Sequence, residues 1–359
     1  PIGIFMREWL NLYNSKSGER GIYNRQSAVS KSLENGRRDT EHEFGTNPCS
    51  EIILRPYQFC NLTEVVVRSD DTLASLKKKV EYATILGTFQ STLTDLKYLR
   101  KIWRDNTEQE RLLGVSLTGI MDSELLNDAT DTGLEKRLQE LRQVAVDTNL
   151  GLSDALGIEQ STAITCVKPS GTVSQLVNSA SGIHARHSNY YVRTVRGDKK
   201  DPLTQFLIDQ NIPCEDDVMQ PDNTAVFSFP VESPEKAVTR NDTSALAQLD
   251  LWLLYQRNWC EHKPSVTITV KEDEWLDVGA WVYNNFDDVA GISFLPHSDH
   301  TYKQAPYQEC NKKDYLSLAK TMPDNIDWSL LSDYEVEDNT KGGQELACTA
   351  DACEIVDIT

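Results

Sequence analysis

The sequence has no long hydrophobic run. Its longest apolar stretch, Leu251–Tyr255, is far shorter than the roughly 20 residues that cross a bilayer, so we expect no membrane span. Residues 1–8 also lack the basic and then apolar layout of a signal peptide, and the expected compartment is therefore the cytoplasm. Residue 1 is not Met, which suggests a processed, trimmed or incomplete piece of a longer chain.

Positive charge is scarce. The 359 residues include 36 Lys and Arg against 55 Asp and Glu, a formal net charge of −19. A nucleic-acid surface has to neutralise phosphates with clustered Lys and Arg, so this balance argues against a DNA or RNA polymer as partner. A single nucleotide held by a few groups in a cleft is not excluded.

No cysteine pair has C-x-x-C spacing, although the chain has eight cysteines. This absence argues against a zinc knuckle and a thioredoxin-type motif. Without an export signal, reduced thiols are expected. Two histidine pairs with three-residue spacing, His184 with His187 and His297 with His300, have no obvious third ligand, so no metal site is predicted. Four cysteines are interpreted as core residues: Cys166, Cys214, Cys260 and Cys310.

The composition, 39% hydrophobic and 25% charged, is typical of a soluble globular protein with one large or two ordinary domains. Residues 2–47 are polar and rich in Gly, Asn and Arg, so little regular structure is expected there. Strands alternating with helices predict an α/β architecture with substantial parallel pairing. Strands are expected at 51–54, 62–67, 111–119, 163–167, 192–195, 225–229 and 266–270, and helices at 72–102, 131–156 and 243–258.

The end of the sequence combines a polar, Gly-containing stretch, residues 335–343, with Cys348 and Cys353. Two thiols on a mobile tether can form a disulfide and exchange it with another disulfide. The simpler alternative is a pair of incidental thiols on a disordered end. Exposed free cysteines are usually avoided on soluble proteins, which favours a swinging redox arm.

Asn47-Pro48-Cys49-Ser50-Glu51, followed by Cys60, is the most informative element. Taken alone, a cysteine two residues before a glutamate is more simply a buried thiol beside a solvated carboxylate. The apolar strand that follows and the thiol pair at the end of the sequence favour a functional interpretation. One thiol could react inside the protein while others carry electrons out.

Lys168-Pro169-Ser170-Gly171-Thr172-Val173-Ser174 is a Gly-containing, hydroxyl-rich loop before an expected helix. Such a loop offers backbone N–H groups and hydroxyls to an anion, with phosphate as the natural ligand. A helix N-cap with a Ser/Thr turn explains the same residues, and no Walker pattern is present.

Together these elements resemble the ribonucleotide reductases, most closely the carboxy-terminal half of the monomeric adenosylcobalamin-dependent (class II) ribonucleoside-triphosphate reductases. The resemblance covers nearly the whole chain in six colinear segments. They are residues 17–24, 47–52 with 59–62, 113–119, 168–174, 181–184 and the terminal cysteine pair.

The resemblance implies part of a ten-stranded α/β barrel with a finger loop that carries Cys49 into its centre. Cys49 would form the thiyl radical that abstracts the ribose 3′ hydrogen. Glu51, expected on the same side of an extended loop, would take the 3′-hydroxyl proton, and Asn47 would hydrogen-bond the ribose. A dry interior would protect the radical.

The resemblance also implies a path for electrons and a phosphate site. Cys60 would be one of two thiols that reduce the 2′ position, and its partner lies in the amino-terminal half. Cys348 and Cys353 would regenerate the resulting disulfide and be reduced by a thioredoxin-like protein. The substrate phosphates would be held by Pro169, Ser170, Gly171 and Thr172.

Two departures from the family bear on this interpretation. The first reducing cysteine, half of the barrel strands and much of the effector site are missing, so residues 1–335 would be half of a catalytic barrel and 336–359 a redox tail. The chain alone should be inactive. Iron-radical relatives, which would act on diphosphates, have a Tyr-Tyr pair before the tail cysteines, whereas here only Tyr334 lies in that region. This difference favours adenosylcobalamin as cofactor.

Two other functions remain open. One is a catalytically incomplete nucleotide-binding or regulatory module that keeps the phosphate loop. The other is a thiol-disulfide oxidoreductase unrelated to nucleotides, against which the absence of C-x-x-C argues.

Overall fold

The computed structural model describes residues 1–18, 20–297, 303–335, 345–349 and 352–356, the last two ranges as backbone only. The described chain divides into two compact units. Unit 1 comprises residues 1–186 and 236–297, and unit 2 comprises 187–235 and the described residues from 303 onward. We describe each unit by itself. No helix among the described residues is long and apolar enough to span a membrane.

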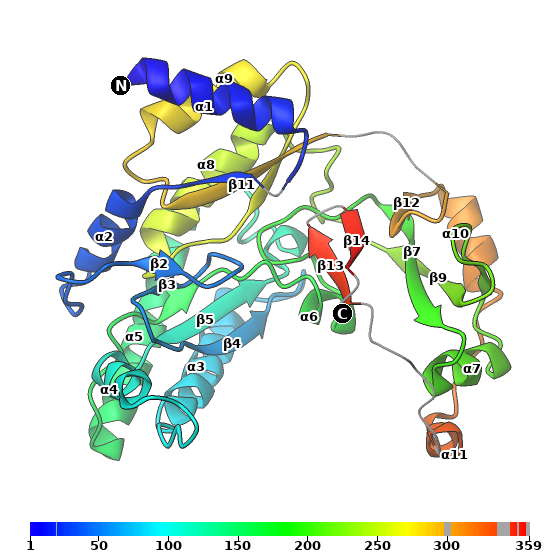
Figure 1. The fold of residues 1–359 in the computed structure, drawn as a ribbon, viewed down its shortest axis with the longest axis horizontal. Coiled ribbons are helices and arrows are strands. Elements are labelled where there is room, and N and C mark those ends of the chain that lie inside the picture. Colours follow the sequence, from blue (N-terminus) through cyan, green and yellow to red (C-terminus); the bar gives the residue numbers. More distant parts are fainter. Residues whose placement is uncertain (19, 298–302, 336–344, 350–351, 357–359) are drawn as a thin grey trace. The chain divides into compact units, whose positions relative to one another are not determined.

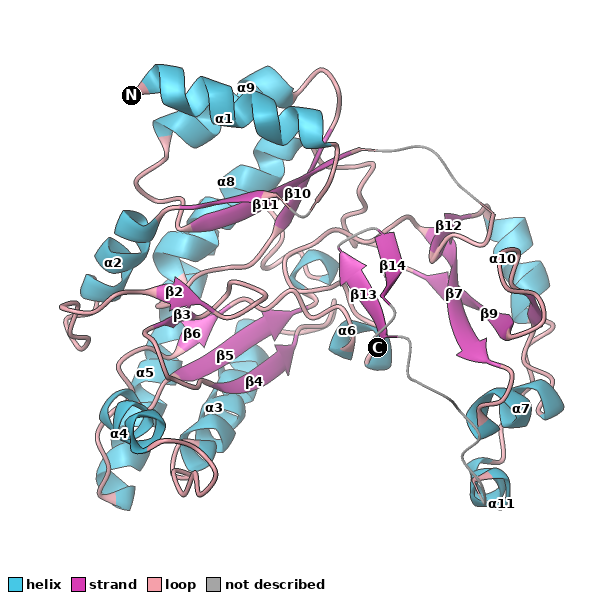
Figure 2. Cartoon of the chain, in the orientation of Figure 1, coloured by secondary structure: helices cyan, strands magenta, loops and turns pink. Residues whose placement is uncertain are grey.

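Unit 1 is a mixed α/β unit with two three-stranded sheets and a short hairpin (Figures 1 and 2). Its helices are α1 (Ile2–Ser15), α2 (Arg25–Leu33), α3 (Leu73–Gln90), α4 (Lys101–Glu110), α5 (Leu134–Leu156), α6 (Val173–Leu176), α8 (Ala245–Asn258), α9 (Trp275–Asn284) and a 3₁₀ turn (Ile120–Asp122). Its strands are β1 (Gly21–Tyr23), β2 (Gly45–Thr46), β3 (Ile53–Leu54), β4 (Asn61–Val66), β5 (Leu113–Thr118), β6 (Thr165–Cys166), β10 (Thr267–Val270) and β11 (Gly291–Pro296).

The central sheet of unit 1 has the order β4-β5-β6, and both pairings are parallel. A second sheet, β1-β11-β10, pairs β10 with β11 in parallel and β1 with β11 antiparallel. The predicted parallel pairing is therefore confirmed in unit 1. Because the carboxyl ends of parallel strands meet at one edge, the loops after β4, β5 and β6 lie near one another.

A large hydrophobic core and a smaller buried cluster are described in unit 1. Helix α3 packs against α5 and strand β4 (Figure 1). It begins at Thr72, whose side chain accepts from the Ser75 N–H while the Ser75 hydroxyl receives the Thr72 N–H, a reciprocal cap that satisfies two helix-end donors. Burial of the apolar face of each helix supplies the main driving force.

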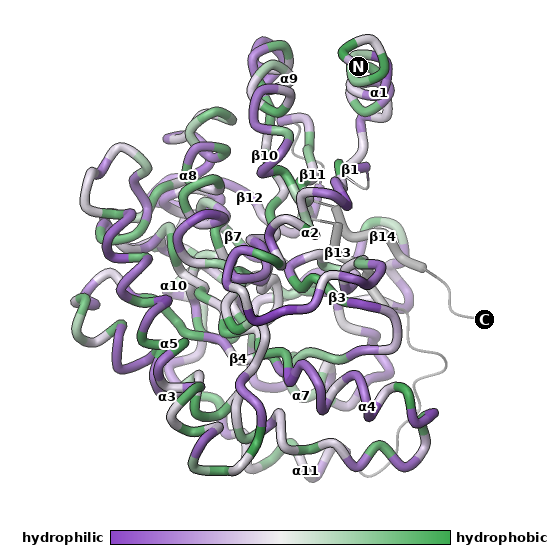
Figure 3. The backbone as a smooth tube through the Cα atoms, turned by 90° about the vertical axis from the view of Figure 1, so that its left-hand side faces the viewer, coloured by the Kyte–Doolittle hydropathy of each residue, from purple (hydrophilic) through white to green (hydrophobic). Residues whose placement is uncertain are grey.

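Two expectations about helices need correction. Residues 2–47 contain α1 and α2 rather than little regular structure. In α1, Phe5 and Trp9 pack on the aromatic side chains of α9 and β11, and hydrophobic and hydrophilic segments alternate along the helix (Figure 3). The polar composition of the following residues obscures that short periodic stretch.

The expected helix over 72–102 is likewise two helices, because α3 ends at Gln90 and α4 begins at Lys101. The hydroxyls of Ser91 and Thr92 donate to the carbonyls of Thr88 and Phe89, both at 2.7 Å. Such local side-chain hydrogen bonds compete with helix continuation.

Unit 2 is built on a four-stranded antiparallel sheet with the order β12-β7-β9-β8. Its small core comprises Ile212, Ala225 and Phe227. Its strands are β7 (Tyr190–Asp198), β8 (Cys214–Asp216), β9 (Thr224–Glu232), β12 (Tyr307–Glu309), β13 (Glu345–Thr349) and β14 (Ala352–Val356). Its helices are α7 (Pro202–Asp209), α10 (Lys312–Ala319), α11 (Leu331–Tyr334) and a 3₁₀ turn (Trp328–Leu330).

Candidate active site

The central feature of the site is the loop that joins β2 to β3, residues 47–52, which we call the Cys49 loop. The two strands pair antiparallel, with Thr46 opposite Ile53. Asn47 closes the loop, because its N–H donates to the Ile52 carbonyl at 3.4 Å and its Oδ1 accepts from the Ile52 N–H at 3.1 Å. The amide nitrogen of Asn47 has no acceptor among the described residues, so its two N–H donors remain available to a ligand.

The Cys49 loop is turned rather than extended, contrary to expectation. Ser50 has φ +67°, and its N–H donates to the Asn47 carbonyl at 2.9 Å. The alternation of side chains along an extended strand therefore does not apply. Cys49 is exposed, whereas Glu51 is completely buried.

Glu51 is a buried carboxylate without a conventional hydrogen-bond donor. Neither of its oxygens accepts a hydrogen bond from the described residues. The ammonium of Lys168 lies 3.5 Å from Oε1 and compensates the charge. Lys168 itself follows β6, and its N–H is held by the Ser116 hydroxyl of β5 at 2.8 Å. The carboxylate thus keeps its lone pairs free to accept a proton from a ligand.

Cys60 lies immediately before β4, as the sequence predicts, and is partly buried. Burial raises the pKa of its thiol, and the negative charge of Glu51 raises it further. Gly114 of β5 leaves room for it, since a Cβ there would lie 3.3 Å from the Cys60 sulfur. At neutral pH Cys60 is therefore held as a thiol, which can give up hydrogen, rather than as a reactive thiolate.

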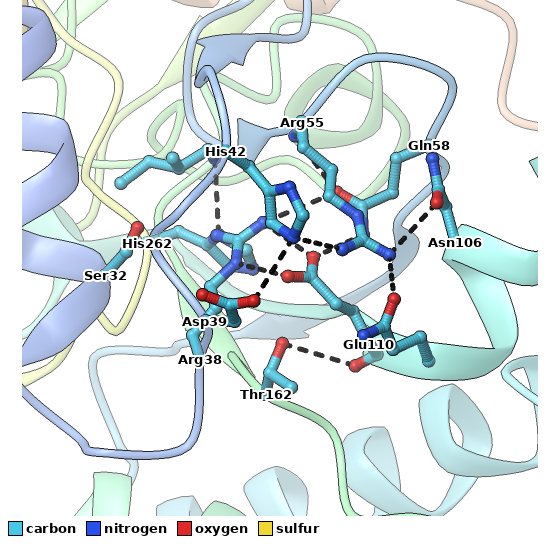
Figure 4. A network of polar contacts seen from close by, with 12 residues as sticks. Ser32, Arg38, Asp39, His42, Arg55, Gln58, Asn106, Glu110, Thr162 and His262 are labelled. Atoms are coloured by element: carbon cyan, nitrogen blue, oxygen red, sulfur yellow. Dashed lines mark hydrogen bonds and ion pairs between the residues drawn. The ribbon is translucent and has the colours of Figure 1, made fainter.

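The turn between Cys49 and Cys60 is fastened by a buried polar network (Figure 4). Arg38 donates two hydrogen bonds to Glu110 of α4, at 3.1 and 2.9 Å. Gln58 also donates to Glu110 and accepts from the Arg55 N–H at 3.1 Å. The Arg55 guanidinium donates to Gln109 at 2.6 Å. Apart from Arg55 Nε, which has no partner among the described residues, these groups satisfy one another, and the network fixes the path from one cysteine to the other.

The loop 168–174 has the tight backbone that its composition suggests. Ser170 is buried with φ +57°, while Gly171 and Thr172 are exposed and their N–H groups have no acceptor among the described residues. Gly182, with φ +55°, packs against the backbone of this loop. A Cβ on it would lie 2.3 Å from the Lys168 carbonyl oxygen. The helix that follows, α6, has only four residues, so its dipole contributes little.

Glu64 on β4 faces this loop. Burial raises its pKa, while the nearby Ser170 hydroxyl and the charge of Lys168 act in the opposite direction. The raised pKa moves Glu64 towards its neutral form, which reduces the repulsion that an anion at this loop would meet.

The other cysteines divide by burial. The described cysteines are all free thiols. Cys166 and Cys260 are buried, as expected for core residues, and burial raises the pKa of Cys260 to about 12. Cys214 is exposed and Cys310 is only partly buried, so their assignment to the core is wrong. Both lie in unit 2. Cys214 is on β8, whose three residues are all exposed.

The side chains of Cys348 and Cys353 lie outside the described residues. The backbone register of the antiparallel β13–β14 pair places Cys348 opposite Cys353. No group of three or more His, Cys, Asp or Glu side chains in the described part of the chain could hold a metal ion. His184 is engaged otherwise, since its Nε2 accepts from the Thr267 N–H at 3.0 Å.

Sequence reasoning missed two lysines of this site. Lys168 belongs to a motif that the sequence analysis singled out, but only as part of a phosphate loop. Lys263 is buried, and its ammonium donates to the Ser50 carbonyl and, at 3.2 Å, to the Ser50 hydroxyl. No local pattern marks Lys263, because its partner lies 213 residues away in the sequence.

Solved structures show what this fold is similar to. A crystal structure of a B12-dependent (class II) ribonucleotide reductase matches with a TM-score of 0.74 at 22% identity, over 93% of this chain and 50% of that chain. The class Id ribonucleotide reductase alpha subunit of Actinobacillus ureae matches with a TM-score of 0.55 at 14% identity, over 82% of this chain and 61% of that chain. The predicted α/β fold of ribonucleotide reductases is confirmed.

The sequence is similar to adenosylcobalamin-dependent ribonucleoside-triphosphate reductases. It is 29% identical over 344 residues to the enzyme of Euglena gracilis, which covers 94% of this chain and 46% of that protein. It is 28% identical over 341 residues to the enzyme of Lactobacillus acidophilus, with 87% and 45% covered. No protein-family model matches the chain. The chain spans about half the length of the curated relatives it matches, and the resemblance inferred from the motifs is confirmed.

Proposed function

We propose that this chain carries one half of the catalytic machinery of an adenosylcobalamin-dependent ribonucleoside-triphosphate reductase, which makes deoxyribonucleotides for DNA synthesis. One observation carries the proposal. A buried carboxylate, Glu51, has no hydrogen-bond donor and stands two residues from the exposed thiol of Cys49, with Lys168 compensating its charge. A thiol and a free base in one loop suit hydrogen abstraction from a sugar coupled to proton removal.

Three residues of the Cys49 loop, Asn47, Cys49 and Glu51, have a role in this reaction. The Cys49 sulfur radical takes the hydrogen atom from C3′ of the ribose, which leaves the unpaired electron on C3′ and an S–H bond on Cys49. Glu51 accepts the proton of the 3′-hydroxyl. Asn47, whose amide N–H groups have no acceptor among the described residues, hydrogen-bonds the ribose.

The residues present fit a radical source outside this chain. Cys49 is exposed, so a group bound next to the loop can reach its sulfur. Adenosylcobalamin, when bound, supplies the radical that Cys49 receives. The chain's own contribution is to hold the thiol, the carboxylate and the amide in one loop.

The loop 168–174 is the proposed phosphate site, with Pro169, Ser170, Gly171 and Thr172 against the substrate triphosphate. Support comes from the exposed N–H groups of Gly171 and Thr172 and from the nearby ammonium of Lys168. Backbone N–H groups in a turn form a concave anion site without a net positive surface. A local site of this kind is compatible with the overall charge of −19.

Reduction of the sugar needs two electrons, which come from two thiols that end as a disulfide. We propose Cys60 as one of them, and a cysteine in the part of the reductase that this chain does not span as the other. Cys348 and Cys353, in a tail of residues 336–359 that follows a catalytic part of residues 1–335, then reduce that disulfide by exchange. A thioredoxin-like protein restores the tail, and these reduced thiols suit the cytoplasm.

Replacement of Cys49 tests the proposal. The assay uses the completed enzyme, by which we mean this chain together with the part of the reductase that it does not span, on one polypeptide or two. Cys49→Ser should abolish deoxyribonucleotide formation and leave nucleoside-triphosphate binding, measured by titration calorimetry, unchanged. Cys214→Ser is the control, since Cys214 is also an exposed thiol. Retained turnover in Cys49→Ser would refute the proposal, and binding without turnover in the wild type would favour a regulatory module.

A further inference from the structure

Residues 262–265, which precede β10, donate hydrogen bonds to three consecutive backbone carbonyls of the Cys49 loop. The Ser265 hydroxyl donates to the Cys49 carbonyl at 2.5 Å. The Lys263 ammonium donates to the Ser50 carbonyl, and the Lys263 N–H donates to the Glu51 carbonyl at 3.2 Å. One short segment therefore fixes the backbone of both proposed reacting residues and of the residue between them.

The segment is itself anchored to the core. His262 is buried and accepts from the Ile53 N–H through Nδ1 at 3.3 Å, so its Nε2–H donates to the Leu113 carbonyl at 2.9 Å. Burial lowers the pKa of His262 to about 3, which keeps the ring neutral for both bonds. The Pro264 carbonyl accepts from the Trp252 indole N–H at 3.0 Å. The anchor is rigid because buried groups on both sides satisfy it.

Burial of the Lys263 ammonium at this position is energetically unfavourable. It is 1% exposed, and no carboxylate among the described residues forms an ion pair with its ammonium. Burying an unpaired ammonium costs free energy that hydrogen bonds have to offset. Gly291 of β11 makes room for it, since a Cβ there would lie 2.9 Å from the Lys263 Cε. The fold thus admits a buried cation whose hydrogen bonds go to Ser50.

Ser50 explains why such support is needed. Its φ of +67° lies in the left-handed region, which is unfavourable for a residue with a side chain. A strained residue persists only where its surroundings hold it. Without the bonds to its carbonyl and hydroxyl, the loop would relax, and the Cys49 sulfur and the Glu51 carboxylate would move relative to one another.

We propose that Lys263 and Ser265 are positioning residues, which hold the Cys49 loop in the conformation that the reaction requires. The inference rests on the proposed function for its catalytic meaning. Its structural part stands alone, because the three hydrogen bonds set the loop conformation whatever the loop does. Displacing a reacting group by about 1 Å can cost about a hundredfold in rate, so the loss should appear in kcat rather than in KM.

The test compares Lys263→Met and Ser265→Ala with wild type in the completed enzyme. Met keeps the length of the side chain and removes the donor and the charge. Lys31→Met is the matched control, since Lys31 is also buried and donates to a backbone carbonyl, that of Gln256 at 2.5 Å, but makes no hydrogen bond to the Cys49 loop. Ser265→Thr keeps the hydroxyl and is the conservative rescue.

Two readouts separate positioning from general stability. Deoxyribonucleotide formation should show kcat about tenfold to a hundredfold lower in Lys263→Met and Ser265→Ala, with KM unchanged and activity largely restored in Ser265→Thr. Hydrogen exchange by mass spectrometry should show about tenfold faster exchange in the peptide spanning 45–54 and no change in α5. Lys31→Met should change neither the exchange of that peptide nor kcat.

The outcomes distinguish the two proposals. Unchanged exchange in peptide 45–54 for both variants would overturn the positioning role. If exchange in this peptide is faster in the variants but the wild-type completed enzyme makes no deoxyribonucleotide, the role of Lys263 and Ser265 in holding the loop stands and the proposed function is refuted. Uniformly faster exchange throughout unit 1 would show that Lys263 acts on the whole core, which also overturns the inference.

Discussion

The ammonium nitrogen of Lys168 lies 3.5 Å from Oε1 of Glu51. Glu51 belongs to the Cys49 loop between β2 and β3, and Lys168 opens the loop that follows β6. This ion pair joins the proposed radical centre to the proposed phosphate site. A change in the position of either loop is therefore felt by the other.

Removing the charge of Lys168 should disfavour the ionised form of Glu51. Lys168→Met takes away the ammonium that lies 3.5 Å from the buried carboxylate, and burial of a less compensated charge is unfavourable. We expect kcat of the completed enzyme at neutral pH to fall by about tenfold, the equivalent of about 1.4 kcal/mol. Lys168→Arg should retain more activity. Lys78→Met, which removes an exposed lysine paired with Glu81, is the control, and equal kcat in Lys168→Met and wild type would contradict the role.

The tail cysteines should matter only for a protein reductant. The double variant Cys348→Ser with Cys353→Ser should stop multiple turnovers with a thioredoxin-like protein and spare them with a small dithiol, because a small molecule reaches the internal disulfide directly. Turnover is measured as deoxyribonucleotide per enzyme with each reductant. Equal activity of the variant with both reductants would contradict the swinging arm.

The lowered pKa of Lys263 should make the free energy of unfolding depend on pH. Burial lowers its pKa from 10.5 to about 8 in the folded protein, although the charge of Glu51 acts in the opposite direction. Below about pH 8 the folded and unfolded chains both hold the proton. Between about pH 8 and 10.5 the unfolded chain holds more, so the wild type should gain stability relative to Lys263→Met as pH rises, by at most about 3 kcal/mol.

This gain is measured as the difference between the thermal unfolding midpoints of the completed wild-type enzyme and the Lys263→Met variant across that pH range. Comparing the two at each pH cancels the titration of other groups. Lys31→Met supplies the reference, because that buried lysine is paired with Glu34. A difference between wild type and Lys263→Met that does not change with pH would contradict the lowered pKa of the buried Lys263.

Gly182 should tolerate no side chain. In Gly182→Ala the Cβ would lie 2.3 Å from the Lys168 carbonyl oxygen, at φ +55°, so both the strain and the clash act against the folded state. We expect a loss of about 2–4 kcal/mol and a lower kcat through displacement of Lys168. Denaturant unfolding of the completed enzyme measures the stability. Gly151→Ala, in α5 with nothing within 4 Å of the new Cβ, should instead be stabilising by about 0.5–1 kcal/mol.

Much of the fold is predictable because its signals are local. Short β-branched and apolar runs predict β4 and β5, and the expected helices at 131–156 and 243–258 match α5 and α8 to within a few residues. The α1 helix is not predicted, because its apolar side chains Phe5 and Trp9 pack against the aromatic residues of α9, which lie far away in the sequence. The division into two units, with 187–235 separate from its flanking segments, depends on contacts and leaves no mark on composition.

For the site, the sequence by itself determined the chemistry that is available: a thiol at Cys49, a carboxylate at Glu51 and a second thiol at Cys60, close together along one stretch of chain. Only the tertiary structure decided their states. It turned the loop at Ser50, buried Glu51 without donors, and brought Lys168 and Lys263 to it from more than a hundred residues away. The physical reason is that burial and charge compensation depend on which distant segments pack together, and no local pattern encodes that.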